Sequence, residues 1–161
     1  MDTTILCPTR GGQDSYPNQD YAISLTKERE GDLIFLYVSD VQFLEHTAAP
    51  KIVDIEEELD EMGDFLLTMA TERAHNAGIQ ASSIVEHGQF GKILRQVIQE
   101  HAVDVVVLGK TRVESSHLPP DFIEKLALDF NREMGIEVLL VHEGELFKSF
   151  KGQTDNISTD L

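Results

Sequence analysis

The stretch TTILCPTRGGQDS, residues 3–15, decides the fold of this chain. A short apolar run over residues 5–7 is followed by Pro8, by the pair Gly11-Gly12 and by Asp14-Ser15, where a helical pattern begins. A strand, a glycine turn and a helix start are typical of a parallel α/β sheet whose first loop faces a ligand crevice. We expect this loop to lie at the centre of the sheet. Backbone N–H groups at a helix start attract anions, so the loop is a candidate ligand site, and whether it holds a nucleotide is an open question at this point.

Composition limits the class of protein and its partners. The 161 residues suit one domain with a proper core, and the formal net charge of −16 repels nucleic acid and anionic membranes. The single cysteine, Cys7, excludes an intramolecular disulfide and fits a reducing compartment; its place in a predicted strand indicates a core residue. No signal-peptide pattern occurs, and no run approaches the roughly 20 apolar residues of a membrane helix. We therefore expect a cytoplasmic protein with neither nucleic acid nor a membrane as partner.

Apolar runs alternate with helical patterns along the rest of the chain. Further buried strands are expected over residues 33–38, 79–86, 104–109 and 136–141. Helices are expected over about residues 15–30 and 53–77, from Phe90, and after Pro119-Pro120. Parallel strands joined by right-handed helical crossovers predict a three-layer α/β/α sandwich with a five-stranded parallel sheet. This domain is expected over residues 1–143, and residues 144–161 are predicted to form a polar, partly disordered C-terminal tail.

The second predicted helix carries an apolar stripe at spacings of three and four residues. Its members are Ile55, Leu59, Met62, Leu66 and Met69. We interpret both methionines as core residues. The six histidines have no metal-ligand spacing, so no metal site is predicted. His87 is the only histidine expected at the crevice rim, and we interpret it as a solvated loop residue.

Several segments match one known family in order and spacing. They are Ile5-Leu6-Cys7-Pro8, Gly11, Ser15, Tyr21-Ala22, Gly88, Ile93, the strand 104–109 and the strand 136–141. Over about residues 3–142 the chain resembles the universal stress protein (UspA-like) family. The resemblance implies strand order 3-2-1-4-5, as in adenine nucleotide alpha hydrolase-like folds, with a ligand crevice between the first and fourth strands.

The family's ATP-binding branch carries glycine, two residues, glycine, nine residues, glycine, and serine or threonine. Here Gly109 takes the first position, whereas Arg112, Phe122 and Ile123 take the other three. Glycines there let backbone amides approach the phosphates, so the resemblance implies the branch that lacks the full ATP-binding motif. We assign no cofactor, and ATP and AMP stay the candidates. The predicted ligand-binding residues are Arg10, Gly11, Gly12, Ser15, Val38, Gly109, Lys110, Thr111 and Arg112, whose cations suit a small anionic ligand.

A second resemblance leaves the function open. Residues 10–15, RGGQDS, resemble the Ser-Gly-Gly-x-Asp-Ser loop of the ATP pyrophosphatases, with Arg10 in place of the first serine. The alternative is a glycine turn in which Asp14 or Ser15 caps the helix. The sequence thus supports two hypotheses: a universal stress-type regulatory or binding module without an enzymatic cycle, and an enzyme that binds or hydrolyses ATP at this loop. No catalytic residue is assigned, because Ser115-Ser116-His117 lacks a readable acid and elbow glycines.

The last predicted strand, over residues 136–141, is expected at the edge of the sheet. An unguarded apolar edge invites pairing with another chain. In the family this strand mediates a two-fold dimer, so we expect a homodimer here as well. The predicted interface residues are Ile136, Val138, Leu139, Leu140 and Val141.

Overall fold

The computed structural model of the chain describes residues 3–39, 49–109 and 121–152. The strands are β1 (Thr4–Pro8), β2 (Asp32–Ser39), β3 (Ala81–His87), β4 (Val105–Gly109), β5 (Glu137–His142) and β6 (Glu145–Phe150). The helices are α1 (Tyr16–Arg29), α2 (Ala49–Asn76), α3 (Phe90–Glu100) and α4 (Phe122–Met134), and a 3₁₀ turn, Gln13–Ser15, precedes α1. Among these residues no helix is long and apolar enough to cross a membrane.

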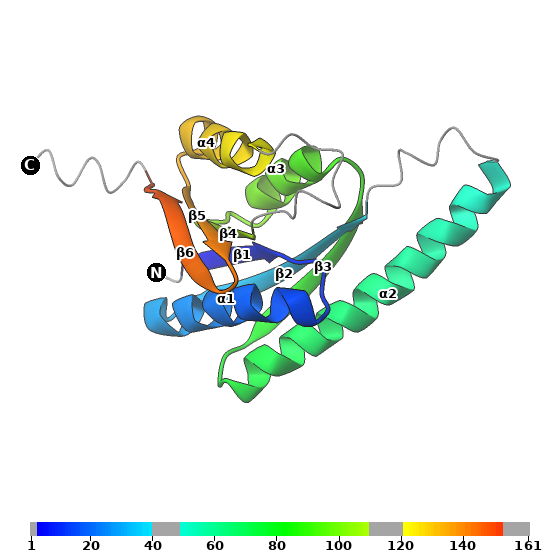
Figure 1. Ribbon diagram of the computed structural model, residues 1–161, viewed down its shortest axis with the longest axis horizontal. Helices are drawn as coiled ribbons and strands as arrows, with labels where there is room; N and C mark the ends of the chain where they lie inside the picture. The colour runs from blue at the N-terminus through cyan, green and yellow to red at the C-terminus, as the bar shows by residue number, and fades with distance from the viewer. Residues whose placement is uncertain (1–2, 40–48, 110–120, 153–161) are drawn as a thin grey trace, which may run out of the picture.

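The sheet has the order β3-β2-β1-β4-β5-β6. The first five strands are parallel, and only β6 runs antiparallel, beside β5. Helices α1 and α2 cover one face and α3 and α4 the other (Figure 1). The predicted three-layer fold with the order 3-2-1-4-5 is thereby confirmed. The central pair is β1 and β4, where Ile5 lies beside Val105 and Leu6 beside Val106.

Successive side chains of a strand point to opposite faces of the sheet, so the strands contribute to two separate hydrophobic cores. In β1, Leu6 packs under α3 and α4, whereas Ile5 and Cys7 pack under α1 and α2. Cys7 is only 2% exposed, which confirms its interpretation as a core residue.

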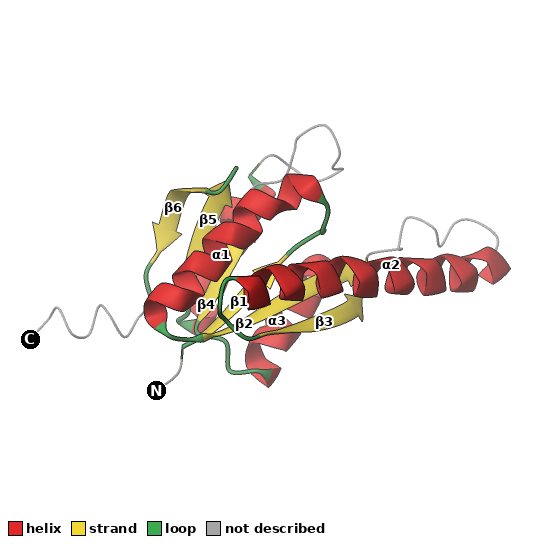
Figure 2. Ribbon diagram, turned by 90° about the horizontal axis from the view of Figure 1, so that it is seen from below, coloured by secondary structure: helices red, strands yellow, loops and turns green. Residues whose placement is uncertain are grey.

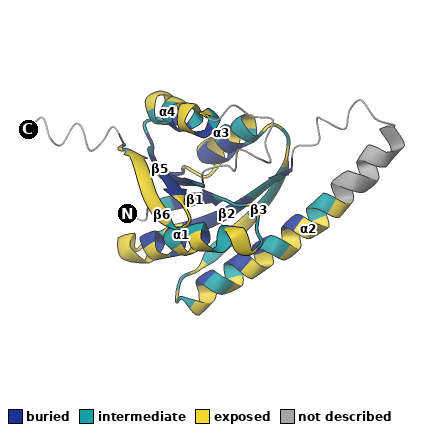
Figure 3. Ribbon diagram, in the orientation of Figure 1, coloured by how far each residue is buried: buried dark blue, intermediate teal, exposed yellow. Residues whose placement is uncertain are grey.

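Helix α2 is rotated relative to the predicted stripe. Met62 and Met69 are exposed, so their interpretation as core residues is wrong. The buried face carries instead small residues and one leucine: Gly63, Leu67, Ala70 and Ala74. The reason is close approach, since a Cβ at Gly63 would lie 2.7 Å from the ring of Tyr37 in β2. Figure 3 shows the exposed outer face of the helix, and Figure 2 shows the same helix from the side.

The chain does not become an irregular tail at residue 144, because β6 follows β5 directly. Glu143 and Gly144 both have positive φ, 52° and 83°, and this conformation favours a tight hairpin. The hydropathy pattern missed β6 because the strand mixes three polar and three apolar residues, ELFKSF, without the continuous apolar run of a buried strand, and all but Phe150 are exposed. Residues 153–161 of the predicted tail lie outside the described part of the chain.

The hairpin also corrects the predicted sheet edge, because β6 occupies the edge of β5. The expected interface residues are at most 8% exposed within the single chain; they are Ile136, Val138, Leu139, Leu140 and Val141. The prediction that the last apolar strand presents a free edge is therefore wrong.

Candidate ligand site

The loop between β1 and α1 is held in place by Thr9. The Thr9 amide donates to the Leu36 carbonyl at 2.8 Å, which fixes the loop to β2. The Thr9 hydroxyl oxygen accepts hydrogen bonds from the Gly11 amide at 3.1 Å and from the buried Gln19 side chain at 3.0 Å. The loop is therefore attached to β2 and to α1.

Both glycines of this loop adopt conformations that other residues avoid. The φ angles of Gly11 and Gly12 are 73° and 76°. A Cβ on Gly11 would lie 2.5 Å from the Leu66 side chain, whereas one on Gly12 would face open space. Ser15 occupies the helix N-cap position, but its side chain makes no capping hydrogen bond, so the predicted serine cap is wrong. The half-buried backbone at Gly12, with open space beside it and a helix start next to it, suits an anion.

The end of β4 meets the same region through Asn18. A Cβ on Gly109 would lie 2.8 Å from the Asn18 side-chain nitrogen, and the Asn18 oxygen accepts from the Gly144 amide at 2.9 Å. Asn18 thus joins α1, the end of β4 and the β5–β6 turn. Gly109 therefore lies beside α1, the helix into which the glycine loop leads.

The residues after Gly109 at the predicted phosphate loop fall on two segments of the chain. Lys110, Thr111 and Arg112 lie outside the described residues. Phe122 and Ile123, which take the last two positions of the family's ATP motif, begin α4 and pack into the core beneath α3 and α4. No phosphate-facing role is left for these two side chains.

Arg10 and Val38 have different surroundings. Burial raises the pKa of the Tyr37 phenol, while nearby Arg10 lowers it and Asp60 raises it further. Arg10 is exposed and influences the face that α2 covers, whereas Val38 packs against the core under α3 and α4. Arg10 and Asp60 thus both lie close enough to Tyr37 to act on the pKa of its phenol.

That acidic residue belongs to a polar cluster that the sequence analysis missed. His87 Nδ1 lies 2.8 Å from the Ser39 hydroxyl, and His87 Nε2 lies 2.9 and 3.1 Å from the two Asp60 oxygens. His87 is exposed, as expected, but it ends β3 and has two side-chain partners, so its interpretation as a loop residue is wrong. The pairing of β2 with β3 places Ser39 beside His87, and the packing of α2 on these strands adds Asp60.

The cluster connects α2 to the carboxyl ends of β2 and β3. A neutral imidazole that donates from Nε2 to Asp60 accepts at Nδ1 from the Ser39 hydroxyl. Ser39 is only 5% exposed, so its hydroxyl does not face an external substrate. This geometry supports an anchoring role for the cluster and not a nucleophilic one.

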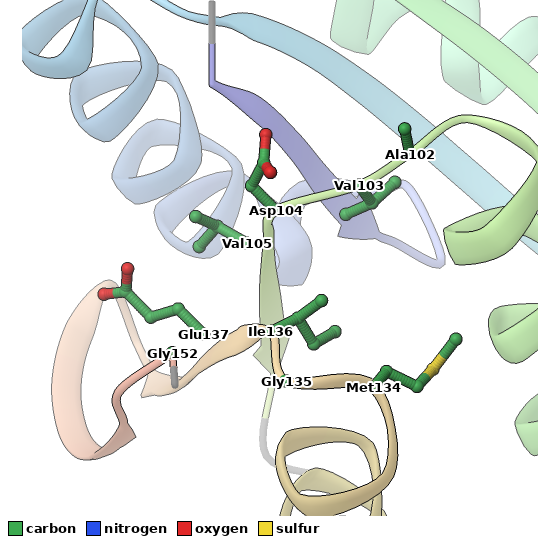
Figure 4. Close-up of a pocket in the computed structure, with 9 residues that line it drawn as sticks. All are labelled: Ala102, Val103, Asp104, Val105, Met134, Gly135, Ile136, Glu137 and Gly152. Carbon is green, nitrogen blue, oxygen red and sulfur yellow. The ribbon is translucent and has the colours of Figure 1, made fainter. Parts of the chain in front are cut away.

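A pocket of about 420 Å³ lies at the opposite edge of the sheet, where β4 and β5 begin (Figure 4). Its two carboxylates already have partners. Asp104 accepts from the Thr4 amide at 2.9 Å, and Glu137 forms a bidentate pair with Arg29 at 2.7 and 3.0 Å. Glu137 is therefore paired with a cation, whereas the exposed Asp104 carboxylate accepts only from a neutral amide. The described residues contain no group of His, Cys, Asp or Glu that could hold a metal ion.

A parallel sheet whose order reverses between β1 and β4 defines a doubly wound α/β protein with its crevice at the switch point. Residues 1–123 match the model of the universal stress protein family, and the chain belongs to this family. No curated protein matches the sequence.

Solved structures share the fold at low identity. Universal stress protein UspA from Lactobacillus plantarum is 16% identical with a TM-score of 0.69, over 86% of this chain and 97% of its own. A universal stress protein family protein from Arabidopsis thaliana with AMP bound is 13% identical with a TM-score of 0.54, over 87% and 91%. The universal stress protein from Archaeoglobus fulgidus in complex with dAMP is 10% identical with a TM-score of 0.53, over 87% and 97%.

Proposed function

We propose that this protein is a universal stress-type regulatory module that binds an adenine nucleotide where β1 and β4 end. The observation that carries the proposal is the close approach of Gly109, at the end of β4, to Asn18 in α1, beside the switch point between β1 and β4. The AMP and dAMP in the two relatives support this ligand class.

The nucleotide we propose is a monophosphate and not ATP. Phe122 and Ile123 pack into the core at positions where the family's ATP-binding branch has glycine and a hydroxyl residue. A chain of three phosphates therefore loses backbone contacts there, whereas one phosphate can bind at the Gly12 backbone beside Arg10. No enzymatic cycle is part of the proposal.

The test is thermal unfolding with AMP, Mg-ATP and adenosine at equal concentrations. A ligand that binds only the folded chain raises the melting temperature, and we expect AMP to give the largest rise. The variant Arg10→Glu reverses an exposed charge at the loop and should abolish most of the rise. Arg132→Glu, an equally exposed change on the last turn of α4, is the matched control and should retain it.

Two results would contradict this function. Equal melting temperatures with and without millimolar AMP and ATP would exclude nucleotide binding. Release of pyrophosphate from ATP, lost on Gly12→Glu, would identify the loop as that of an ATP pyrophosphatase-type enzyme instead.

A homodimer stays a prediction, as does a cytoplasmic location. Because β6 covers β5, a strand-mediated dimer has to use the outer edge of β6, where Leu146 and Phe147 are exposed. Sedimentation velocity at high micromolar concentration should then give a dimer, and Leu146→Lys with Phe147→Lys should dissociate it. A monomer at that concentration would refute the dimer.

A further inference from the structure

Three large apolar side chains form a row on the outer face of α2. Met62, Phe65 and Met69 follow at spacings of three and four residues and are 47%, 64% and 37% exposed. The helix already buries its opposite face, through Leu67, against the sheet. Clustered apolar side chains that folding leaves in water mark interaction surfaces in soluble proteins. We name these three residues the α2 stripe.

Carboxylates surround the α2 stripe. Exposed Glu58 lies one helical turn before Met62, Glu61 lies one turn before Phe65, and Glu72 follows Met69 by three residues. The nearby cation Arg73 is engaged by α1, since it pairs with Asp20 and stacks 4.1 Å from the centre of the Tyr16 ring. The surface therefore combines apolar anchors with negative charge.

We propose that the α2 stripe docks a basic amphipathic helix of a partner protein. Anchors at helical spacing match the apolar face of such a helix, and flexible methionines adapt to its side chains. Lysines and arginines beside that face complement the three glutamates and speed association. The proposal concerns a surface separate from the nucleotide loop and does not depend on nucleotide binding.

A second copy of this chain is a poorer occupant. Two acidic stripes repel each other, and the whole chain carries a formal net charge of −16. Three side chains also fall well short of the roughly 800 Å² per partner that a stable interface buries. A short helix of opposite charge removes the first objection and needs less area, because its binding can be transient.

The test measures binding of a fluorescein-labelled peptide by anisotropy. The peptide carries leucines and phenylalanines on one helical face and lysines on the other, and its control is a scrambled peptide of the same composition. We expect a micromolar Kd for the amphipathic peptide and a Kd at least roughly tenfold higher for the scrambled one.

Variants separate the α2 stripe from general charge attraction. The triple change Met62→Gln, Phe65→Gln and Met69→Gln should raise the Kd roughly tenfold or more, since exposed anchors can be removed without unfolding the helix. Leu146→Gln with Phe147→Gln removes two apolar side chains of similar exposure on β6, and it should leave the Kd per protomer unchanged even where it dissociates the predicted dimer. Glu58→Gln, Glu61→Gln and Glu72→Gln together should weaken binding and reduce its salt dependence. Circular dichroism verifies that each variant is folded.

Three outcomes would overturn the proposal. Equal binding of the scrambled peptide would reduce the effect to net charge. An unchanged Kd in the folded triple variant would place the peptide elsewhere. A self-association of the protein that the triple variant abolishes would identify a second copy as the occupant.

Discussion

At the scale of single residues, Thr9 makes three hydrogen bonds that hold the loop between β1 and α1 in place. One hydroxyl oxygen accepts from the Gly11 amide and from Gln19, and the same residue's amide binds Leu36. Buried donors without an acceptor cost about 1–3 kcal/mol each, so this one oxygen stabilises the whole loop. The glycines alone allow many conformations, and Thr9 selects among them.

Cys7 gives the chain a pH dependence at alkaline pH. Complete burial raises the pKa of its thiol to about 12, from 9.0 in water. The unfolded chain therefore ionises first, and the stability that the neutral thiol contributes is full below pH 9 and is lost as the pH rises towards 12. Between pH ~8 and pH ~10.5 we expect this residue to cost about 2 kcal/mol of unfolding free energy.

Urea unfolding of the native chain and of Cys7→Ala at both pH values measures this cost as the difference between their pH slopes. Equal slopes would contradict it. An aromatic disulfide reagent should also leave the folded protein unlabelled while it labels the chain in urea.

At the scale of elements, Gly63 determines how closely α2 approaches the sheet. We expect Gly63→Ala to destabilise the fold by about 1–3 kcal/mol, because the added methyl group would lie 2.7 Å from the Tyr37 ring. This is the reverse of the gain of about 1 kcal/mol that alanine brings to a helix interior. Urea denaturation of the variant measures the sign.

A double variant identifies the cause. With Tyr37→Leu in the background, Gly63→Ala should be neutral or stabilising, because the ring no longer occupies the space. A destabilisation of the same size in both backgrounds would exclude the close contact as the reason.

At the scale of the whole molecule, charge opposes folding. The chain has 29 acidic and 13 basic residues, so compaction brings like charges together. We expect the melting temperature to rise by several degrees between ~20 mM and ~0.5 M sodium chloride, as the Debye length shortens. Choline chloride should give the same rise if screening is the cause. A fall with salt would mean that the surface ion pairs outweigh the repulsion.

The sequence by itself determined the architecture. Near-continuous apolar runs indicate strands covered on both faces, and the glycine turn after the first run indicates the crevice. Local patterns of this kind do not depend on what other parts of the chain contribute. The neighbouring positions of β1 and β4, with Gly109 at the end of β4, follow from the strand order that the resemblance implies.

Only the tertiary structure decided which side chains meet. Gly63 displaced the methionines of α2 from the core because close approach favours small residues over hydropathic ones. Strand pairing placed Ser39 beside His87. The strand β6 pairs with the edge of β5 that the sequence analysis expected to be free. Each of these three features depends on contacts between residues of different elements. The hydropathy pattern along the sequence does not say how closely two elements approach each other.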